Sequence, residues 1–125
     1  PANPGGLFAV RMATGEQVWH TPSPDGPCSL PRCNRAQAAA ISVIPGALFS
    51  GAMNGWFRAY DSRNGKIIWE FDTGVEFKTV NGVAGKGGSI DGPGPAIVGG
   101  MVFTNSGYSQ FGGVPGNVLL AFGLD

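Results

Sequence analysis

The sequence predicts an all-β chain that is built from repeated four-stranded units. Its 125 residues include 22 Gly and 10 Pro, and only 13% of them are charged. This composition excludes a coiled coil, a helical bundle and a charge-driven disordered segment. The second observation is an internal repeat. At a fixed offset of 50 residues it aligns Ala9 with Ala59, Gly15 with Gly65 and Trp19 with Trp69.

Each copy of the repeat reads as a strand, a turn and a strand. Residues 7–11 and 17–20 flank the turn Thr14-Gly15, and the same order returns around the turn Asn64-Gly65. Glycine favours such turns because it adopts positive φ without a steric penalty. The run after each turn is rich in β-prone residues and ends in Trp. Both copies are therefore predicted to be β-hairpins.

Two further apolar segments precede the second hairpin and complete one unit. Its four strands are predicted at residues 38–43, 47–52, 56–61 and 67–71. A four-stranded unit of about 50 residues that ends in a recurring Trp is typical of a β-propeller blade. Related strand segments return near the C-terminus, at residues 95–98, 101–105 and 119–122.

The strand count predicts about two and a quarter blades of one propeller domain, residues 1–125. Residues 7–20 form the end of one blade, residues 37–73 a complete blade and residues 89–125 a last, incomplete blade. Closed propellers contain about four to eight blades. We therefore expect this chain to be the C-terminal part of a longer propeller, with the remaining blades as its partners.

Charge and hydropathy exclude two classes of partner. Eight basic residues balance eight acidic residues, so no basic surface for nucleic acid is predicted. The sequence contains no uninterrupted apolar run of about 18 residues, so no membrane span is predicted.

Cys28 and Cys33 have four residues between them. This spacing does not match a Cys-x-x-Cys redox motif or a haem attachment site, and no further metal ligands lie nearby in the sequence. A disulfide that closes a small loop is the leading interpretation, and it predicts an oxidising compartment. Two free thiols in a cytosolic loop are the alternative that the sequence leaves open.

The second copy of the repeat has the pattern Ala-x-Asp-x-x-x-Gly-x-x-x-Trp, formed by Ala59, Asp61, Gly65 and Trp69. This pattern is similar to the W-motif repeat of pyrroloquinoline quinone (PQQ) dehydrogenases. The first copy departs from it, because Arg11 stands where the Asp would be. In that family the Trp of each blade docks on the neighbouring blade. The resemblance therefore implies structural docking roles for Trp19 and Trp69, and we expect Trp69 to be buried between blades.

The C-terminal half resembles the C-terminal blades of polyvinyl-alcohol-dehydrogenase-like quinoproteins. The strings that carry this resemblance are Val80-Asn81-Gly82-Val83, Lys86-Gly87-Gly88-Ser89-Ile90-Asp91-Gly92-Pro93-Gly94-Pro95, Ser106-Gly107-Tyr108 and Gly116-Asn117-Val118-Leu119-Leu120-Ala121-Phe122. The resemblance extends over nearly the whole chain. It implies a periplasmic enzyme that oxidises alcohols with PQQ, which a Ca²⁺ ion holds, and that passes electrons to a c-type cytochrome.

A non-catalytic PQQ-like propeller that acts as a protein-binding scaffold is the alternative from another class. An acid and amide constellation on inner strands further upstream would favour the enzyme. This chain offers no counterpart of the family's Ca²⁺ ligands or catalytic acid, so no metal ligand and no catalytic residue is assigned. We expect the 125 residues alone to be inactive.

Residues 81–89 are predicted to be a glycine-rich crossing to the next blade, at one mouth of the propeller channel. Gly87 and Gly88 would allow a flat anionic ligand to approach the backbone closely. Lys86 could pair with a carboxylate of the quinone, and Asn81 could donate a hydrogen bond to a quinone oxygen. The alternative is a flexible loop with a solvated Lys86.

Tyr108 and Phe111 lie in an insertion of eight residues and are candidates for the wall of a substrate pocket. Asp91 precedes Gly-Pro and is interpreted first as a turn former, with a Ca²⁺ ligand or a base as the alternative. His20 has no catalytic partner and is expected to be structural. Trp56 is expected to pack over a turn, and Arg58 to form an interblade salt bridge.

Overall fold

The computed structural model describes residues 4–109 and 112–124, and these residues form eleven strands and no helix. The strands are β1 (Gly6–Val10), β2 (Gln17–Pro22), β3 (Ser42–Ile44), β4 (Ala47–Gly51), β5 (Trp56–Asp61), β6 (Ile67–Asp72), β7 (Glu76–Lys78), β8 (Ala84–Lys86), β9 (Ala96–Val98), β10 (Met101–Ser106) and β11 (Val118–Gly123). Every pairing between them is antiparallel. The all-β prediction is confirmed.

The central sheet has the strand order β3-β4-β5-β6, in which each strand pairs with its neighbour in sequence. Its first strand is shorter than predicted, because β3 covers only Ser42–Ile44 instead of residues 38–43. The backbone before β3 forms hydrogen bonds with other segments. The Ala40 N–H donates to the Gly92 carbonyl, and the Ala36 carbonyl accepts from the Met53 N–H. These bonds divert residues 36–40 from pairing with β4.

The two repeat hairpins share one backbone geometry. Gly15 and Gly65 both have a φ of +72°. Each donates its N–H to the carbonyl four residues earlier, on Arg11 at 2.7 Å and on Asp61 at 2.8 Å. In both hairpins the register also shifts by one residue within the first strand, between residues 9 and 10 and between residues 59 and 60. The repeat read from the sequence is thus a structural repeat.

The remaining strands form a three-stranded sheet, β11-β10-β9, and two hairpins, β1-β2 and β7-β8. Hairpin β7-β8 was not expected, because residues 81–89 were predicted to be a loop. In the structure the chain crosses to the next sheet only at residues 87–95. The short strands β7 and β8 have three residues each, which is too few to show a clear alternation in the sequence.

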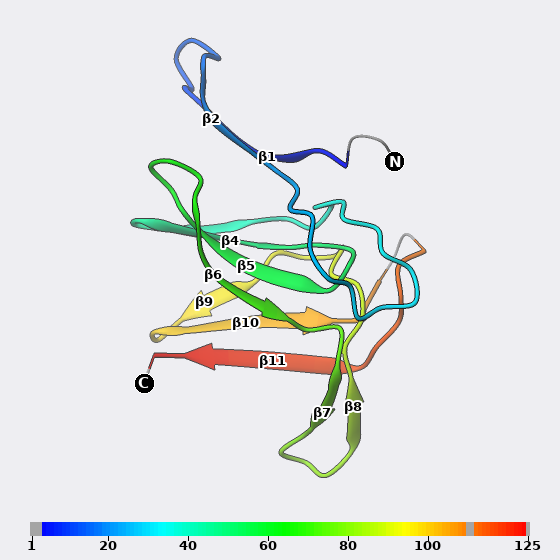
Figure 1. Cartoon of the computed structure of the whole chain (residues 1–125). Coiled ribbons are helices and arrows are strands. Elements are labelled where there is room, and N and C mark those ends of the chain that lie inside the picture. The colour runs from blue at the N-terminus through cyan, green and yellow to red at the C-terminus, as the bar shows by residue number, and fades with distance from the viewer. Residues whose placement is uncertain (1–3, 110–111, 125) are drawn as a thin grey trace.

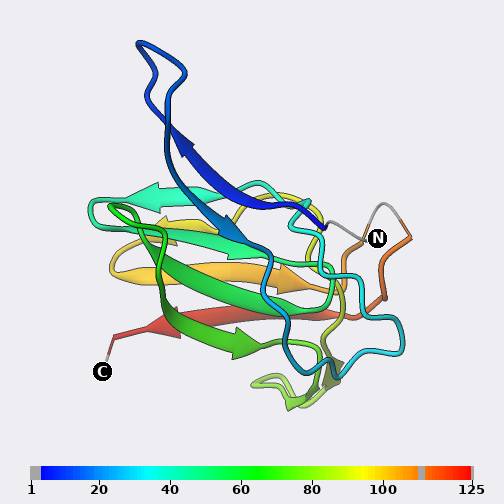
Figure 2. The ribbon, with the colours of Figure 1, turned by 45° about the horizontal axis from the view of Figure 1, so that its top comes forward.

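The sheets are stacked in layers. Figure 1 shows β1-β2 above the four-stranded sheet and β9–β11 below it. Strand β5 is the centre of the stack. Tyr60 packs with Leu7 and Leu48 on the side of β1-β2, and Phe57 packs with Ile90 on the opposite side. Because side chains alternate along a strand, β5 contributes to both cores. Figures 1 and 2 both show hairpin β7-β8 projecting beyond β11.

The two repeat tryptophans differ in their surroundings. Trp19 donates its indole N–H to the Ser62 carbonyl at 3.0 Å, and its ring lies against Gly65 in the turn of the neighbouring sheet. Trp69 contacts Phe57, Phe71 and Phe122 but is 37% exposed. Trp69 is therefore only partly buried among the described residues, and its burial between the blades of a longer propeller remains a prediction. The adjacent sheet has no described strand after β11 that could provide a turn equivalent to the one under Trp19.

Candidate functional site

Four segments gather at the end of the stack where β4, β6 and β10 end (Figure 1). They are the long β2-β3 loop (residues 23–41), the β4-β5 turn, the connector (residues 87–95) and the described part of the β10-β11 loop (residues 107–109 and 112–117). Apart from Phe111, which lies outside the described residues, the predicted cofactor and pocket residues lie on the connector, on the β10-β11 loop or on hairpin β7-β8. This end of the molecule is the candidate site.

Buried hydroxyl groups fix the connector to both neighbouring sheets. Thr73 and Ser106 are both 0% exposed, and their oxygens lie 2.7 Å apart. The Thr73 hydroxyl donates to the Gly55 carbonyl at 2.6 Å, and the Ser106 hydroxyl lies 3.0 Å from the Gly88 carbonyl, which can accept its proton. Ser106 Oγ also accepts from the Gly88 N–H at 2.9 Å. The alternative of a flexible loop therefore does not describe residues 87–91, which are buried.

Gly87 and Gly88 are needed for close packing within the chain itself. A Cβ atom on Gly87 would lie 1.5 Å from the Thr73 carbonyl oxygen, and one on Gly88 would lie 2.2 Å from the Val114 carbonyl oxygen. Neither position tolerates a side chain without movement of the backbone. The observed close approach is to neighbouring backbone, and a contact of these glycines with a quinone remains a prediction.

Asn81 lies at the exposed tip of hairpin β7-β8. Its Oδ1 accepts hydrogen bonds from the Thr79 hydroxyl at 2.6 Å and from the Val83 N–H at 3.2 Å. This arrangement is an Asx-type turn, in which the side chain replaces a backbone acceptor. Asn81 therefore stabilises the turn and lies away from Gly87 and Gly88, which are in the buried connector.

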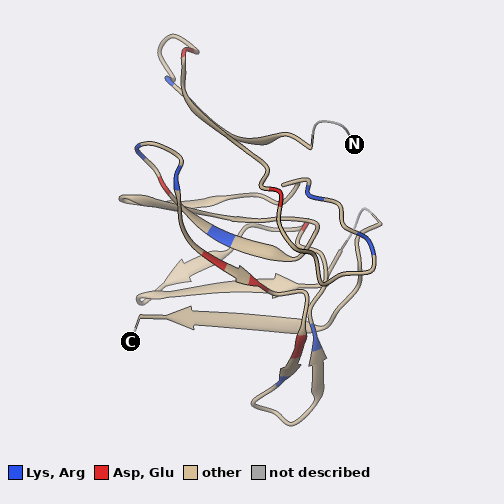
Figure 3. Ribbon diagram, viewed as in Figure 1, with Lys and Arg blue, Asp and Glu red and all other residues tan. Residues whose placement is uncertain are grey.

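Lys86 lines an open cleft of about 410 Å³ between hairpin β7-β8 and the β10-β11 loop. Glu76 lines the same cleft and is the cross-strand partner of Lys86, which Figure 3 shows as opposite charges on β7 and β8. Asn117 bounds the other side. Its Oδ1 accepts from the Lys86 N–H at 2.8 Å, and its Nδ2 donates to the Ala84 carbonyl at 3.2 Å. Of the four predicted cofactor residues, only Lys86 lines this cleft.

Asn117 is not among the site residues predicted from the sequence. It pairs with the outer edge of β8 as a strand would, and it attaches the hairpin to the start of β11. The only local signal was the turn-forming sequence Pro-Gly-Asn before an apolar run, which is typical of any loop end.

A second, smaller pocket of about 160 Å³ lies between the β2-β3 loop and the β10-β11 loop. Arg32 and Asn34 line it from one side, Gly112, Gly113 and Val114 line it from the other, and Met53 and Ser89 line it as well. The Arg32 guanidinium donates to the Gly113 carbonyl at 3.4 Å. None of these residues was a candidate from the sequence, because the loops that carry them lie far apart along the chain.

The predicted pocket-wall residues are only partly described. Tyr108 is 56% exposed, and Phe111 lies outside the described residues. Asp91 is 4% exposed and accepts a hydrogen bond from the Ser109 hydroxyl at 2.9 Å. The burial and the Ser109 contact give Asp91 a structural role next to the bend at residues 92–93.

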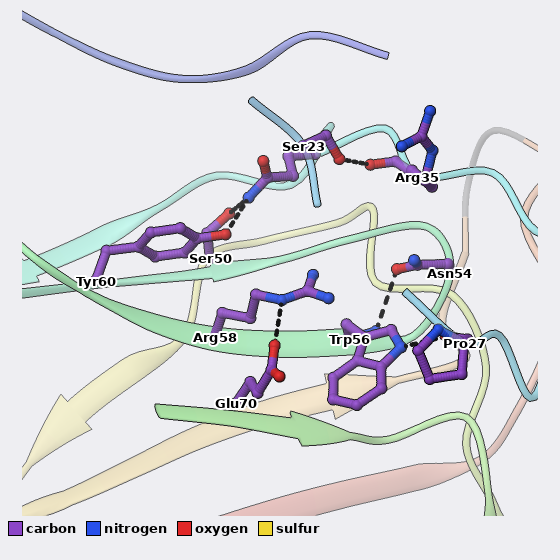
Figure 4. Close-up of polar contacts among 10 residues, drawn as sticks. Ser23, Pro27, Arg35, Ser50, Asn54, Trp56, Arg58, Tyr60 and Glu70 are labelled. Atoms are coloured by element: carbon purple, nitrogen blue, oxygen red, sulfur yellow. Dashed lines mark hydrogen bonds and ion pairs between the residues drawn. The ribbon is translucent and has the colours of Figure 1, made fainter. Parts of the chain in front are cut away.

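A polar network lies on the face of β5 that is turned toward β1-β2, opposite the face that carries Phe57 (Figure 4). Arg58 is 2% exposed and pairs with Glu70 at 3.0 Å. Since these residues are opposite each other in β5 and β6, the predicted interblade salt bridge is wrong: the pair lies within one sheet. The Arg58 guanidinium also lies 5.0 Å from the centre of the Trp56 ring. An ion pair within one sheet forms with a smaller loss of conformational entropy, because adjacent strands already hold both residues in place.

Tyr60 belongs to the same network. The Gln37 side-chain amide donates to both the Tyr60 hydroxyl and the Ser50 hydroxyl at 3.1 Å (Figure 4). Burial raises the pKa of Tyr60 above its usual value, although Arg58 opposes this shift. The phenol is therefore protonated at neutral pH and acts as a structural hydrogen-bonding group.

Three further predictions concern the disulfide, Trp56 and His20. Cys28 and Cys33 form a disulfide, as the leading interpretation predicted. Trp56 donates its indole N–H to the Pro27 carbonyl at 2.8 Å, so it holds the β2-β3 loop on the sheet (Figure 4). His20 stacks on Phe8 with ring centres 4.0 Å apart, which gives it a packing role.

The described residues contain no group of three or more His, Cys, Asp or Glu side chains that could hold a metal ion. The residues that were predicted to bind the quinone do not surround one common space. Asn81 lies at a hairpin tip, and Gly87 and Gly88 are covered by backbone. The described part of the chain therefore fits PQQ only through Lys86 and its cleft, and it does not enclose a cofactor.

No protein-family model matches the chain. It is 45% identical to the polyvinylalcohol dehydrogenase of a Sphingopyxis species and 41% identical to that of a Pseudomonas species, in alignments that cover 96% of the chain. The chain is homologous to the polyvinylalcohol dehydrogenases. It spans 20% of the length of each of these relatives. A quinohemoprotein alcohol dehydrogenase of Pseudomonas putida is 24% identical in an alignment that covers 85% of this chain and 14% of that enzyme.

The crystal structure of BamB from Moraxella catarrhalis has a fold similar to that of this chain. The two structures superpose with a TM-score of 0.61 at 20% identity, over 96% of this chain and 32% of the BamB chain. BamB is a β-propeller protein, so the stacked sheets have the arrangement of propeller blades, and they are not closed into a ring. In the described residues, no helix has the length and apolar character needed to cross a membrane.

Proposed function

We propose that the chain is a section of a PQQ-dependent alcohol dehydrogenase, where it supplies blades of the propeller and one wall of the cofactor pocket. The observation that carries this proposal is the 41–45% identity to polyvinylalcohol dehydrogenases across 96% of the chain. The names of these relatives point to a polymeric alcohol as the substrate. The BamB likeness at 20% identity concerns the fold alone, so it does not favour the binding-scaffold alternative.

PQQ and Ca²⁺ belong to this proposal. Bound PQQ would supply the two-electron oxidation of the alcohol. Lys86 is the residue of this chain that could hold it, because its ammonium group lines an accessible cleft and could pair with a carboxylate. Tyr108 is proposed as part of the substrate wall. The Ca²⁺ ligands and the catalytic acid are assigned to blades outside this chain.

A chimera tests the proposal directly. In the Sphingopyxis relative, this chain would replace the aligned segment, and PQQ affinity and dye-linked oxidation of polyvinyl alcohol would be measured. We expect activity within about tenfold of the parent, because the exchanged blades share the same fold. A folded chimera that binds no PQQ would contradict the proposal.

The role of Lys86 is tested in the same chimera. Lys86→Ala should weaken PQQ binding by about tenfold or more, since a hydrogen bond to a charged group contributes about 1.5–3 kcal/mol. Lys78→Ala on the other strand of the hairpin is the matched control, because Lys78 does not line the cleft. Unchanged affinity in Lys86→Ala would remove Lys86 from the site.

We also propose a periplasmic location and a c-type cytochrome as electron acceptor. The Cys28–Cys33 disulfide supports an oxidising compartment. Alkylation of thiols in periplasmic extract, before any reductant is added, would test the location. We expect both cysteines to resist alkylation, and fully alkylated cysteines would contradict it.

A further inference from the structure

The loop closed by the disulfide, residues 28–33, lies against the base of the hairpin that carries Lys86. Leu30, at its centre, is 5% exposed. A Cβ atom on Gly74 would lie 2.9 Å from Leu30 Cδ2, so the Leu30 side chain is seated directly on the Gly74 backbone. Beside it, the Ser29 hydroxyl donates to the Asp72 carboxylate. These two contacts hold the point where β6 ends and hairpin β7-β8 begins.

The other side of the same loop reaches the β10-β11 loop. Arg32 donates to the Gly113 carbonyl at 3.4 Å and lines the 160 Å³ pocket together with Asn34. The stem of the loop is held by the Trp56 indole N–H, which donates to the Pro27 carbonyl at 2.8 Å. The disulfide loop thus contacts the end of the four-stranded sheet at Asp72, the residue Gly74 that leads into hairpin β7-β8, and the β10-β11 loop at Gly113.

The loop has no strand pairing of its own to maintain this shape. Residues 23–41 contain no strand, and two prolines flank Leu30 at positions 27 and 31. A covalent closure lowers the number of conformations that such a segment can adopt. The disulfide is therefore the local constraint that keeps Leu30 at Gly74 and Arg32 at Gly113.

We propose that the Cys28–Cys33 loop is a positioning element, which fixes hairpin β7-β8 and the β10-β11 loop relative to the four-stranded sheet. Its importance for a cofactor site rests on the proposed function, whereas its mechanical role does not. The hairpin also has contacts of its own, including the Asn117 hydrogen bonds and the packing of Phe77 on Phe71, whose ring centres are 6.4 Å apart. Loss of the loop should therefore loosen the hairpin without unfolding the sheets.

Hydrogen exchange of the intact protein, read by mass spectrometry, tests the mechanical role. In the double variant Cys28→Ser/Cys33→Ser, amides of residues 74–86 and 112–117 should exchange at least about tenfold faster. Amides of β1-β2 should keep their rates, because the described contacts of Ser29, Leu30 and Arg32 are with Asp72, Gly74 and Gly113. Faster exchange that is confined to residues 23–41 would overturn the proposal.

A second variant keeps the experiment decisive if the cysteine variant does not fold. Leu30→Ala retains the disulfide but empties the contact with Gly74, and it should accelerate exchange in residues 74–86. The matched control is Leu119→Ala, since Leu119 is 70% exposed and lies outside this contact. Equal exchange in residues 74–86 for Leu30→Ala and the control would also overturn the proposal.

PQQ affinity, measured in the chimera, separates this inference from the proposed function. If exchange of residues 74–86 rises and PQQ affinity falls, both ideas are supported. If exchange rises and affinity stays constant, the positioning role stands and Lys86 loses its place in the cofactor site. If exchange does not rise, the positioning role fails whatever the affinity.

Discussion

At the scale of single residues, Trp19 and Trp69 occupy the same place in the repeat but have different partners. Trp19 has an acceptor for its indole N–H and a glycine under its ring, whereas Trp69 is 37% exposed beside Phe122. The motif therefore sets where the indole lies, and the neighbouring layer decides how far it is buried.

The paired substitutions Trp19→Ala and Trp69→Ala test this difference. Trp19→Ala should lower the free energy of unfolding by about 3–5 kcal/mol, as truncations of packed aromatic side chains do. Trp69→Ala should cost less in this chain, because part of its ring is already in contact with water. Urea unfolding followed by circular dichroism gives both values, and an equal or larger cost for Trp69→Ala would contradict the assignment.

Asp61 makes the second hairpin sensitive to acid. Arg63 donates to both of its carboxylate oxygens, at 3.0 and 2.6 Å, and this ion pair lowers the pKa of Asp61 to about 2. A carboxyl group with a lowered pKa in the folded state stabilises the fold above its unfolded pKa of about 3.9. That contribution is lost as the pH falls through about 2.

We therefore expect wild type to lose more stability than Asp61→Asn between about pH 4 and pH 2. The measurement is the urea midpoint at each pH, and the difference between the two proteins removes the titration of other carboxyl groups. Superimposable pH curves would show that the ion pair does not form in solution.

At the scale of elements, the two repeat hairpins allow a comparison that the chain itself provides. Gly15 and Gly65 share a φ of +72°. A Cβ atom on Gly15 would meet nothing within 4 Å, whereas one on Gly65 would lie 2.5 Å from the Trp19 ring. The same backbone position is free in one hairpin and forms a docking surface in the other.

Gly15→Ala should cost about 1–2 kcal/mol, which is the strain of a left-handed conformation for an L-residue. Gly65→Ala should cost clearly more, because the same strain is combined with displacement of Trp19. Denaturant unfolding of the two variants measures the difference. Equal costs would mean that the Trp19 ring moves away without loss of stability.

Hairpin β7-β8 depends on one side chain outside it. Asn117→Ala would remove both hydrogen bonds to the edge of β8, each of which contributes about 1 kcal/mol. We expect faster amide exchange at residues 84–86, with unchanged exchange in β3–β6. Asn105→Ala, on the neighbouring strand β10, is a suitable control because Asn105 makes no described contact with β8. Protection of residues 84–86 that survives Asn117→Ala would count against this role.

At the scale of the whole molecule, the stack is open on both sides. On the outer face of β1-β2, Phe8, Val10 and Val18 are each more than half exposed, and on β11 Leu119 is 70% exposed. Between the four-stranded and three-stranded sheets, an apolar groove of about 440 Å³ is lined by residues that include Trp69 and Phe122. Faces of this kind are typical of surfaces that pack against further layers.

The chain alone should therefore neither bind PQQ tightly nor oxidise an alcohol, because a ligand site normally encloses most of its ligand. Titration of the isolated chain with PQQ and Ca²⁺, followed by a dye-linked alcohol assay, is the measurement. The chimera serves as the positive control. Micromolar binding with turnover by the isolated chain would contradict the proposed division of the site.

The sequence by itself determined the elements that depend on local rules. A glycine at each turn, β-prone runs on both sides and a Trp at a fixed offset were sufficient to place both repeat hairpins and the four-stranded sheet. The disulfide could also be predicted from the sequence, because two nearby cysteines without other metal ligands have few alternative roles. These features depend on neighbours along the chain, which a linear pattern records.

Only the tertiary structure decided which surfaces those elements share. It seated Leu30 on Gly74, placed Arg58 against Glu70 within one sheet, and brought Asn117 to the edge of β8. It also covered Gly87 and Gly88 with backbone, although their composition suggested an open cradle. These contacts join segments that are separated in sequence, and their geometry follows from how the sheets stack, which no local pattern encodes.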